Sequence, residues 1–435
     1  MKSVKRLTRR DFLRKSAAAT LGAAAFPYII PCLAFGANDR VNIGCIGNGP
    51  QGTGLMRGVL GHAQARVVAV CDVNRLRRDE AKRAVDQQYG NTDCVAYNDF
   101  RELLARGDID GVVIATPDHW HVPIGVYAAK AGKDMYIEKP LMLSLSQGQV
   151  LRETVQRYGR VYQYGTQQRS SWEFRFACEL VRNQRIGELK RIKVGSPASI
   201  VSETIAPEPV PDWLDYDRWL GPAPWAPYSE KRIVNAYWWH KTDYALGFVA
   251  GWGIHHVDIA QWGAGADEGC EGGKGAKGVV EVEGTGVFPA DGFCDCATKW
   301  NVIMRYADGV ILDYTDEGQN RHGITFEGTE GWVYVARGVI DAQPKRLLMT
   351  AFGPGDVRLY ESKNHIGNYL DCIRSRVRTI CPIEVAIRSD MICHLSDIAM
   401  RLGRKLRWDP AQERFLEDDG ANRMLTRAMR APWQV

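Results

Sequence analysis

The chain has 435 residues and a mass of 48.7 kDa, and 45% of its residues are hydrophobic, 25% charged and 10% aromatic. These values exclude disordered, collagen-like and disulfide-scaffold proteins and fit two or three folded units. The net charge of +5 depends on residues 1–36, because the rest of the chain has a net charge of −1, which removes the electrostatic support for nucleic-acid binding.

Residues 1–36 have the layout of an export signal. Seven basic residues precede an uncharged, alanine-rich run over residues 16–37. Residues 8–15, TRRDFLRK, resemble the twin-arginine export signal, in which paired arginines precede Phe-Leu-Lys or a close variant. Here the pair is Arg9 and Arg10. The resemblance implies that twin-arginine export machinery carries the folded chain, with any cofactor, to the periplasm.

Cleavage of this signal is expected near Ala37, after a small-x-small sequence. The alternative is a retained membrane anchor, although Pro27 and Pro31 interrupt the apolar run. We therefore expect no stable membrane association after cleavage.

Five of the eleven cysteines carry an expectation. Cys45 and Cys71 lie in apolar, strand-like runs and are predicted core residues. Cys270, Cys294 and Cys296 lie in a glycine-rich segment and are the candidates for a disulfide in an exported protein. The sequence contains no Cys-x-x-Cys pair of the kind that indicates a zinc site.

A dinucleotide-binding pattern begins at residue 41. Residues 41–46 are a predicted apolar strand, and residues 47–52, GNGPQG, lead from it into a helix that reaches residue 60. This is G-x-G-x-x-G in its strand-to-helix context. The first glycine permits the tight turn, the second lets the backbone approach a pyrophosphate, and the third lets helix and strand pack closely.

The next predicted strand, residues 65–72, ends in Asp72, twenty residues after the last glycine of the motif. A carboxylate there can accept hydrogen bonds from the adenosine ribose and would repel a 2′-phosphate, which favours NAD over NADP. Arg75, Arg77 and Arg78 would partly offset that repulsion. The alternative is an Asp72 that only caps the following helix.

Predicted strands and helices then alternate, which is typical of a doubly wound parallel sheet with its ligand at the carboxyl ends of the strands. Further strands are expected at 94–97, 111–115, 134–137 and 160–164, and helices at 77–89, 99–104, 121–131 and 146–158. Residues 116–121, TPDHWH, and 138–140, EKP, fall at strand ends. The predicted cofactor-binding residues are Gly47, Asn48, Gly49, Gln51, Gly52, Asp72, Thr116, Pro117, His119, His121, Glu138, Lys139 and Gln167.

From residue 41 onward the chain resembles the glucose-fructose oxidoreductase and myo-inositol dehydrogenase family of two-domain NAD(P)-dependent enzymes. The resemblance rests on the glycine loop, 115–117 with the histidines that follow, 138–140, 165–169 and 252–262, and segments 219–224 and 381–384 resemble the branch rich in exported members. It implies an α/β fold, with an N-terminal Rossmann sheet and a C-terminal α+β domain built on a large open, mostly antiparallel sheet. The expected domains are the signal at 1–36, the NAD-binding domain at 37–160, and a substrate-binding and oligomerisation domain at 161–435.

Oxidation of an alcohol needs a hydride acceptor and a base within reach of the hydroxyl. Lys139 fits the base, because burial at a strand end favours its neutral amine. In the family the matching lysine works with the histidine of a D-x-G-x-H motif, and aligning that histidine with His255 puts Gly251 at the position of the acid. The expected catalytic residues are Lys139 and His255, with His256 and Asp258 in support.

Two other interpretations of this histidine pair stay open. His255 and His256 are satisfied core histidines in one, and ligands of a metal with Asp258 in the other. The metal site lacks a third structural element, so no metal is predicted. The resemblance also implies a cis bond between Lys139 and Pro140.

The pattern changes after residue 187 to irregular strands and aromatic loops. Alternation over 302–306 and 310–314 predicts a hairpin within an antiparallel sheet. One sheet face is expected to form the substrate cleft with the first domain, and the resemblance implies that the other is buried in a homodimer or homotetramer.

Two closing helices are expected at 365–376 and 390–402, and Asn364 and His365 are candidate substrate contacts. The sequence thus predicts an exported, NAD-dependent oxidoreductase acting on a hydroxyl of a carbohydrate or cyclitol. Two alternatives are a glycoside lyase or hydrolase that uses tightly bound NAD for transient oxidation, as some relatives do, and a catalytically silent sugar-binding protein, which Gly251 would suit.

Overall fold

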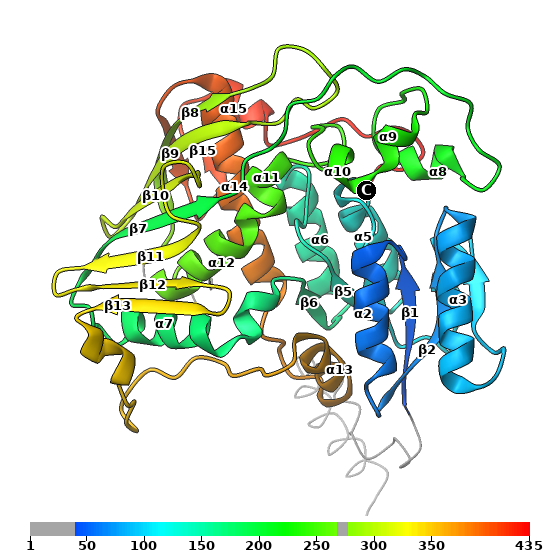
Figure 1. Ribbon diagram of the computed structural model, residues 1–435, viewed down its shortest axis with the longest axis horizontal. Helices are drawn as coiled ribbons and strands as arrows, with labels where there is room; N and C mark the ends of the chain where they lie inside the picture. The colour runs from blue at the N-terminus through cyan, green and yellow to red at the C-terminus, as the bar shows by residue number, and fades with distance from the viewer. Residues whose placement is uncertain (1–39, 268–276) are drawn as a thin grey trace, which may run out of the picture. The chain divides into compact units, whose positions relative to one another are not determined.

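Residues 41–164 fold around a six-stranded parallel sheet, as predicted (Figure 1). The computed structural model describes residues 40–267 and 277–435, so the export signal and Cys270 lie outside the described residues. The strands follow the order β3-β2-β1-β4-β5-β6. They are β1 (Val41–Ile46), β2 (Ala65–Cys71), β3 (Val95–Tyr97), β4 (Gly111–Ile114), β5 (Asp134–Ile137) and β6 (Tyr162–Tyr164).

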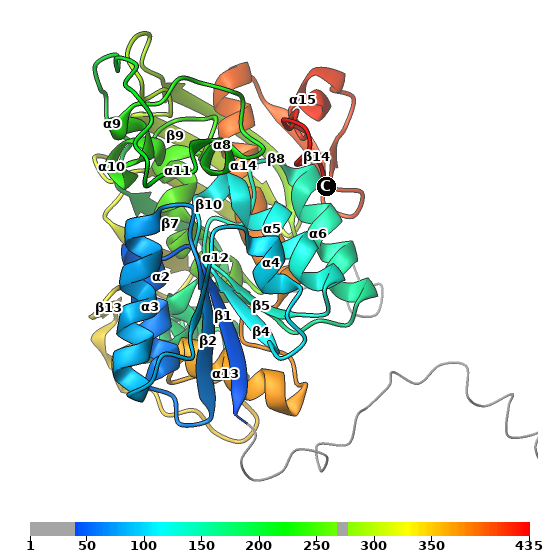
Figure 2. The same ribbon diagram turned by 90° about the vertical axis from the view of Figure 1, so that its right-hand side faces the viewer.

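Helices cover both faces of this sheet because its central strands are buried apolar runs (Figure 2). On one face lie α2 (Pro50–Leu60) and α3 (Arg75–Tyr89), and on the other α4 (Phe100–Leu104), α5 (His121–Lys130) and α6 (Leu145–Arg157). Cys45 and Cys71 are buried core residues, as predicted. The order of the strands changes direction between β1 and β4, so their carboxyl ends open a crevice for a ligand.

The second sheet has nine strands and is mostly antiparallel, in the order β13-β12-β11-β7-β10-β9-β8-β14-β15. The predicted hairpin is present as β9 and β10, and β10 also pairs with β7 in parallel. The strands are β7 (Leu189–Ser196), β8 (Val279–Val287), β9 (Lys299–Tyr306), β10 (Ile311–Asp316), β11 (Gly323–Gly328), β12 (Trp332–Ala336), β13 (Val339–Gln343), β14 (Leu406–Asp409) and β15 (Arg414–Phe415).

Three helices pack on one face of the nine-stranded sheet: α7 (Trp172–Arg182), α12 (Gly253–Ala264) and α14 (Ile383–Leu402) (Figure 1). The expectation that a sheet face itself forms the substrate cleft was therefore wrong, because these helices cover the apolar face. The opposite face carries charged pairs such as Arg191–Asp313 and Lys193–Glu327. Helix α14 begins seven residues before its expected start.

The chain returns to the first sheet near its C-terminus. Helix α13 (His365–Ser375) lies where predicted and packs against α2, and Tyr369 on it donates to the carbonyl of Val112 in β4 at 3.0 Å. Strand β6 ends at Tyr164, four residues past the expected end of the first domain. The parts of Arg40–Val435 that the structure describes belong to one compact unit.

Between β7 and α12 the chain forms long loops and short helices that carry most of the aromatic residues predicted there. The helices are α8 (Tyr216–Leu220), α9 (Glu230–Ile233), α10 (Asn235–Trp238) and α11 (Gly247–Gly251), with α15 (Asp419–Arg423) near the C-terminus. Cys294 and Cys296 are buried free thiols. Within residues 40–267 and 277–435, no helix is long and apolar enough to cross a membrane.

Candidate functional site

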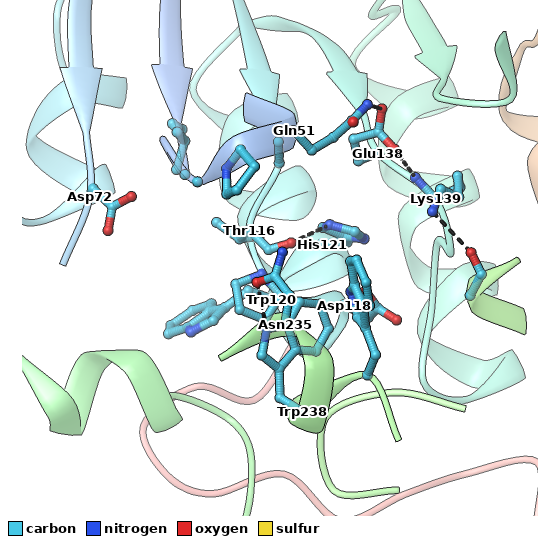
Figure 3. A pocket seen from close by; sticks show the side chains of 18 of the residues that line it. Gln51, Asp72, Thr116, Asp118, Trp120, His121, Glu138, Lys139, Asn235 and Trp238 are labelled. Carbon is cyan, nitrogen blue, oxygen red and sulfur yellow. Dashed lines mark hydrogen bonds between the residues drawn. The ribbon is translucent and has the colours of Figure 1, made fainter. Parts of the chain in front are cut away.

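A pocket of about 860 Å³ opens at the carboxyl ends of the strands of the first sheet (Figure 3). The turns after β1, β2, β4 and β5 form one side, and the segment from α8 to the start of α12 forms the other. Predicted site residues that line it are Gly47, Gly49, Gln51, Asp72, Thr116, Pro117, His121, Glu138, Lys139, Gln167 and His255.

The glycine loop fits a dinucleotide pyrophosphate. Gly47 has φ of +83°, and a Cβ on Gly52 would lie 1.9 Å from the carbonyl oxygen of Gly47, so both positions require glycine. Gly49 caps α2 with no side-chain hydrogen bond, which leaves the first backbone N–H groups of the helix for a ligand. A Cβ on Gly49 would contact only Arg77 among the described residues, at 3.5 Å.

Asp72 lies in the pocket lining at the end of β2, as predicted (Figure 3). Its two carboxylate oxygens accept backbone N–H bonds from Asn48 at 2.7 Å and Asn74 at 2.8 Å. Burial raises the pKa of Asp72, while these hydrogen bonds oppose the rise. Asp72 thus also fixes the conformation of the glycine loop. Asn48 lies outside the pocket lining and contributes its backbone N–H to this hydrogen bond.

Glu138 is the centre of a buried polar network. One of its oxygens accepts hydrogen bonds from Gln51 at 2.8 Å and Gln167 at 2.7 Å, and the other accepts from the backbone of Lys139 at 3.1 Å. The network connects the start of α2, the end of β5 and the turn after β6. It fixes the segment that carries Lys139.

Lys139 and His255 line the same part of the pocket. The amine of Lys139 donates to the backbone carbonyl of Gly251 at 2.9 Å (Figure 3). The Lys139–Pro140 bond is cis, as expected. His255 is 3% exposed, and burial with the charge of Lys139 lowers its pKa well below the usual range. The Nδ1 atom of His255 has no hydrogen-bond partner within the described residues. A neutral imidazole and a lysine amine therefore line the same pocket.

Asp118 is a pocket residue within TPDHWH that was not among the predicted site residues. It is 4% exposed, it lines the pocket, and its Oδ2 atom has no partner in the described part of the chain. Burial raises its pKa well above the usual range, while the charge of Lys139 opposes the rise. The feature that identifies Asp118 as a site residue is its buried oxygen without a hydrogen-bond partner among the described residues, which only the structure reveals.

Residues 213–222, which we call the strap, cross from the C-terminal part of the chain to the end of the pocket that contains Asp72. Backbone bonds join Arg75 N–H to the carbonyl of Trp213 at 2.8 Å and Asp215 N–H to the carbonyl of Val73 at 3.0 Å. The indole of Trp120 donates to the carbonyl of Arg218 at 3.0 Å. Leu214, Arg218 and Trp219 of the strap line the pocket.

The structure places three predicted histidines differently. His121 lies in the lining, between the carbonyls of Pro140 at 2.6 Å and Thr116 at 2.9 Å. His119 and His256 lie outside the lining. His119 bonds the backbone carbonyl of Trp219, and burial lowers its pKa to about 4. His256 bonds the backbone carbonyl of Gly195, and burial lowers its pKa to about 3. His256 therefore packs behind the pocket wall.

Asp258 is also placed away from the pocket, which corrects its expected role in support of catalysis. Its side chain is fully buried and forms a two-pronged ion pair with Arg169, with both bonds at 2.8 Å, and Ser389 donates to it at 2.7 Å. Because these partners saturate the carboxylate, Asp258 stabilises the contact between η3 (Gln167–Ser170), α12 and α14.

The expected substrate contacts Asn364 and His365 lie outside the lining as well. The side chain of Asn364 caps α13 by accepting from Gly367 at 3.0 Å, and His365 is buried between Ser170 and the carbonyl of Tyr164. Gly52 packs behind Gly47, as its proposed role requires. Among the described residues, no group of three His, Cys, Asp or Glu side chains is arranged to hold a metal.

Comparisons with known proteins agree with this geometry. Residues 41–166 match a family model described as an oxidoreductase family, NAD-binding Rossmann fold, and residues 199–435 match one described as an oxidoreductase family, C-terminal alpha/beta domain. The glycosyl hydrolase family 109 protein 2 of Shewanella sp. (strain ANA-3) is 39% identical over 108 residues, which are 24% of this chain and 23% of that protein. The match thus spans less than a quarter of this curated relative.

Solved structures show the same fold. An NAD-binding protein of Listeria innocua superimposes with a TM-score of 0.60 at 16% identity, over 85% of this chain and 99% of the other. The apo scyllo-inositol dehydrogenase of Lactobacillus casei gives a TM-score of 0.57 at 17% identity, over 85% and 98% of the two chains.

Proposed function

Because the chain belongs to the oxidoreductase family that joins an NAD-binding Rossmann fold to a C-terminal alpha/beta domain, we propose that it oxidises or reduces a hydroxyl-bearing carbon of a carbohydrate or cyclitol. Bound NAD supplies the hydride acceptor or donor. The observation that carries the proposal is that Lys139 and His255 line one pocket with the glycine loop. Oxidation of an alcohol requires such proton-transfer groups beside a dinucleotide site.

We assign proton transfer to Lys139 and orientation of the hydroxyl to His255. A hydrogen bond to the carbonyl of Gly251 orients the Lys139 amine, which lines the pocket. In the oxidising direction the substrate O–H bond breaks and the proton passes to the amine as hydride leaves the carbon. In the reducing direction the proton returns. His255 contributes a neutral imidazole to the pocket lining, which can accept the hydroxyl's hydrogen bond.

We propose NAD as the preferred dinucleotide. The carboxylate of Asp72 would face the adenosine ribose, and its remaining lone pairs suit two hydroxyl groups better than a phosphate. Arg77 lies beside Gly49 and opposes this preference through its charge, so the ratio of the affinities for NAD and NADP is the quantity to measure.

A second candidate is cleavage of a glycoside through transient oxidation, in which NAD is restored within each turnover. The strap favours this candidate, because its hydrogen bonds to the first domain would have to break before the adenosine end of a bound NAD could leave the pocket. The name of the Shewanella relative, a glycosyl hydrolase family 109 protein, also agrees with this chemistry.

One experiment separates the candidates. The protein purified without added cofactor is analysed by mass spectrometry for NAD, and a panel of sugars, cyclitols and aryl glycosides is then read for both NADH and released aglycone. Net NADH supports the dehydrogenase, and aglycone without net NADH supports the transient-redox enzyme. Binding of sugars with neither product supports the silent binding protein.

We also propose export through the twin-arginine signal and assembly into a homodimer or homotetramer. Replacing Arg9 and Arg10 by Lys should leave the protein in the cytoplasm, and unchanged periplasmic yield would contradict export. The uncovered face of the nine-stranded sheet is the proposed interface. Light scattering of the purified protein tests the assembly, and a monomeric mass would contradict it.

A further inference from the structure

The pocket lining has three arginines within the described chain, and they differ in how their charges are balanced. Arg218 forms ion pairs with Asp215 and Asp99. Arg77 lies at the dinucleotide end, beside Gly49, where a phosphate-bearing ligand would balance it. Arg337 lies at the other end of the pocket, where neither an ion pair with a described residue nor a dinucleotide phosphate balances its charge.

Arg337 follows β12 in the turn to β13 and reaches the pocket beside the start of α12. Its guanidinium carbon lies 5.0 Å from the ring centre of Trp252, and that indole meets His255 edge to face at 5.9 Å. Glu173 accepts a hydrogen bond from the backbone of Gly338 at 3.1 Å, which fixes the turn. One indole ring therefore separates the guanidinium from the proposed reaction centre.

No ion pair or hydrogen bond of the Arg337 guanidinium is present among the residues that the structure describes. The carboxylate whose charge acts on it is that of Glu138, which Gln51 and Gln167 already satisfy. Arg337 is exposed at the pocket wall, and partial desolvation lowers its pKa. Its N–H donors are therefore accessible to a ligand that brings an anion to this wall.

We propose that the substrate bears a carboxylate which Arg337 binds, so that the substrate class is a hexuronic acid or a glycoside of one. The planar guanidinium presents paired N–H donors that match a carboxylate, and stacking on Trp252 restricts its orientation. A single pyranose ring bridges the width of one indole, with its carboxylate at Arg337 and the reacting hydroxyl at His255 and Lys139. This placement rests on the proposed function for the position of the hydroxyl.

The test compares glucuronate and galacturonate with glucose and galactose on the NAD-loaded protein, first by calorimetric binding and then by NADH formation. Wild-type protein should bind the acids more tightly than the neutral sugars. Arg337→Met should weaken binding of the acids roughly 10- to 100-fold, the range for a hydrogen bond to a charged group, and leave neutral sugars unchanged. Arg337→Lys should fall between, because it keeps the charge but loses the paired donors.

Arg321→Met is the matched control, because Arg321 also lies over an aromatic ring, that of Tyr334, on the same sheet but outside the lining. It should leave all affinities unchanged. Neutral sugars binding as tightly as the acids, or equal losses for both classes in Arg337→Met, would overturn the proposal. Tighter binding of glucose 6-sulfate than of glucuronate would overturn the choice of a carboxylate. If the acids bind through Arg337 without any redox or cleavage product, the proposed function fails while this inference stands.

Discussion

The side-chain amine of Lys139 lies 2.9 Å from the backbone carbonyl oxygen of Gly251 and donates to it. Position 251 is where the family resemblance expects an acid, so the chain offers a neutral peptide oxygen to the lysine at the position where a carboxylate is expected. A carbonyl orients the amine through a hydrogen bond without adding a charge beside it. The loss of the acid side chain therefore removes a charge but leaves the amine directed into the pocket.

Replacing Lys139 by Met should lower turnover by about 10² to 10⁴, because that is the usual contribution of general acid–base catalysis. Met has a similar length and no titratable group, so the fold and bound NAD should persist. Steady-state kinetics on the substrate found in the panel, with mass spectrometry of retained NAD, checks both. Lys130→Met, at the exposed end of α5, is the control and should keep full turnover. Full turnover in Lys139→Met would contradict both redox proposals.

Retention of the cofactor should depend on how the strap packs. Gly221 has φ of +48°, and a Cβ there would lie 2.1 Å from the indole of Trp120, so Gly221→Ala must displace the strap. The variant should release NAD faster and lose it during gel filtration, as followed by absorbance and mass spectrometry. Gly132→Ala has a similar positive φ of +77° without a neighbour within 4 Å, so it controls for backbone strain alone. Equal retention by both variants would show that the strap does not hold the cofactor.

Asp72→Asn should change the choice of dinucleotide. The amide keeps one acceptor for the backbone of Asn48 or Asn74 but loses the charge that disfavours a 2′-phosphate. NAD affinity should fall by about 1.5–3 kcal/mol, as for a hydrogen bond to a charged group, while NADP affinity should fall less or rise. Calorimetry with both dinucleotides gives the ratio. Arg77→Ala should act oppositely and weaken NADP more than NAD, and tighter binding of NADP than NAD by the wild type would refute the assignment.

Local patterns predicted the parts of the fold that local chemistry determines. The six strands of the first sheet, the glycine loop and the strand ends at Thr116 and Lys139 follow from short apolar runs and fixed spacings. The pairing of Arg169 with Asp258 did not follow, because 89 residues separate two side chains that meet only in the folded core. The strap contains only the five-residue helix α8, and Arg337 lies in the short turn between β12 and β13, so neither has a periodic pattern that marks it as part of the pocket. Their contributions to the pocket depend on tertiary packing that a single sequence does not encode locally.

Asp390 provides a test of stability against pH. Its carboxylate is buried and accepts bonds from the backbone of Met142 at 3.0 Å and the hydroxyl of Tyr164 at 3.2 Å, and burial raises its pKa to about 7. The unfolded chain releases the proton near pH 4, so between about pH 4 and 7 only the native state holds it. The stability that this group contributes is therefore complete below pH 4 and is lost as the pH rises toward 7.

Asp390→Asn cannot release a proton, so it should remove this pH dependence. We expect the free energy of unfolding of the wild type, relative to the variant, to fall by about 1.4 kcal/mol per pH unit between pH 4.5 and 6.5 and to level off above pH 8. The amide offers one acceptor instead of two, so a constant loss of about 1–2 kcal/mol should accompany the variant at all pH values. Urea unfolding at four pH values measures both effects. Neighbouring His394 stays neutral over this range, since burial lowers its pKa to about 3. A difference in unfolding free energy between wild type and variant that does not vary with pH would show that Asp390 is ionised in the native protein.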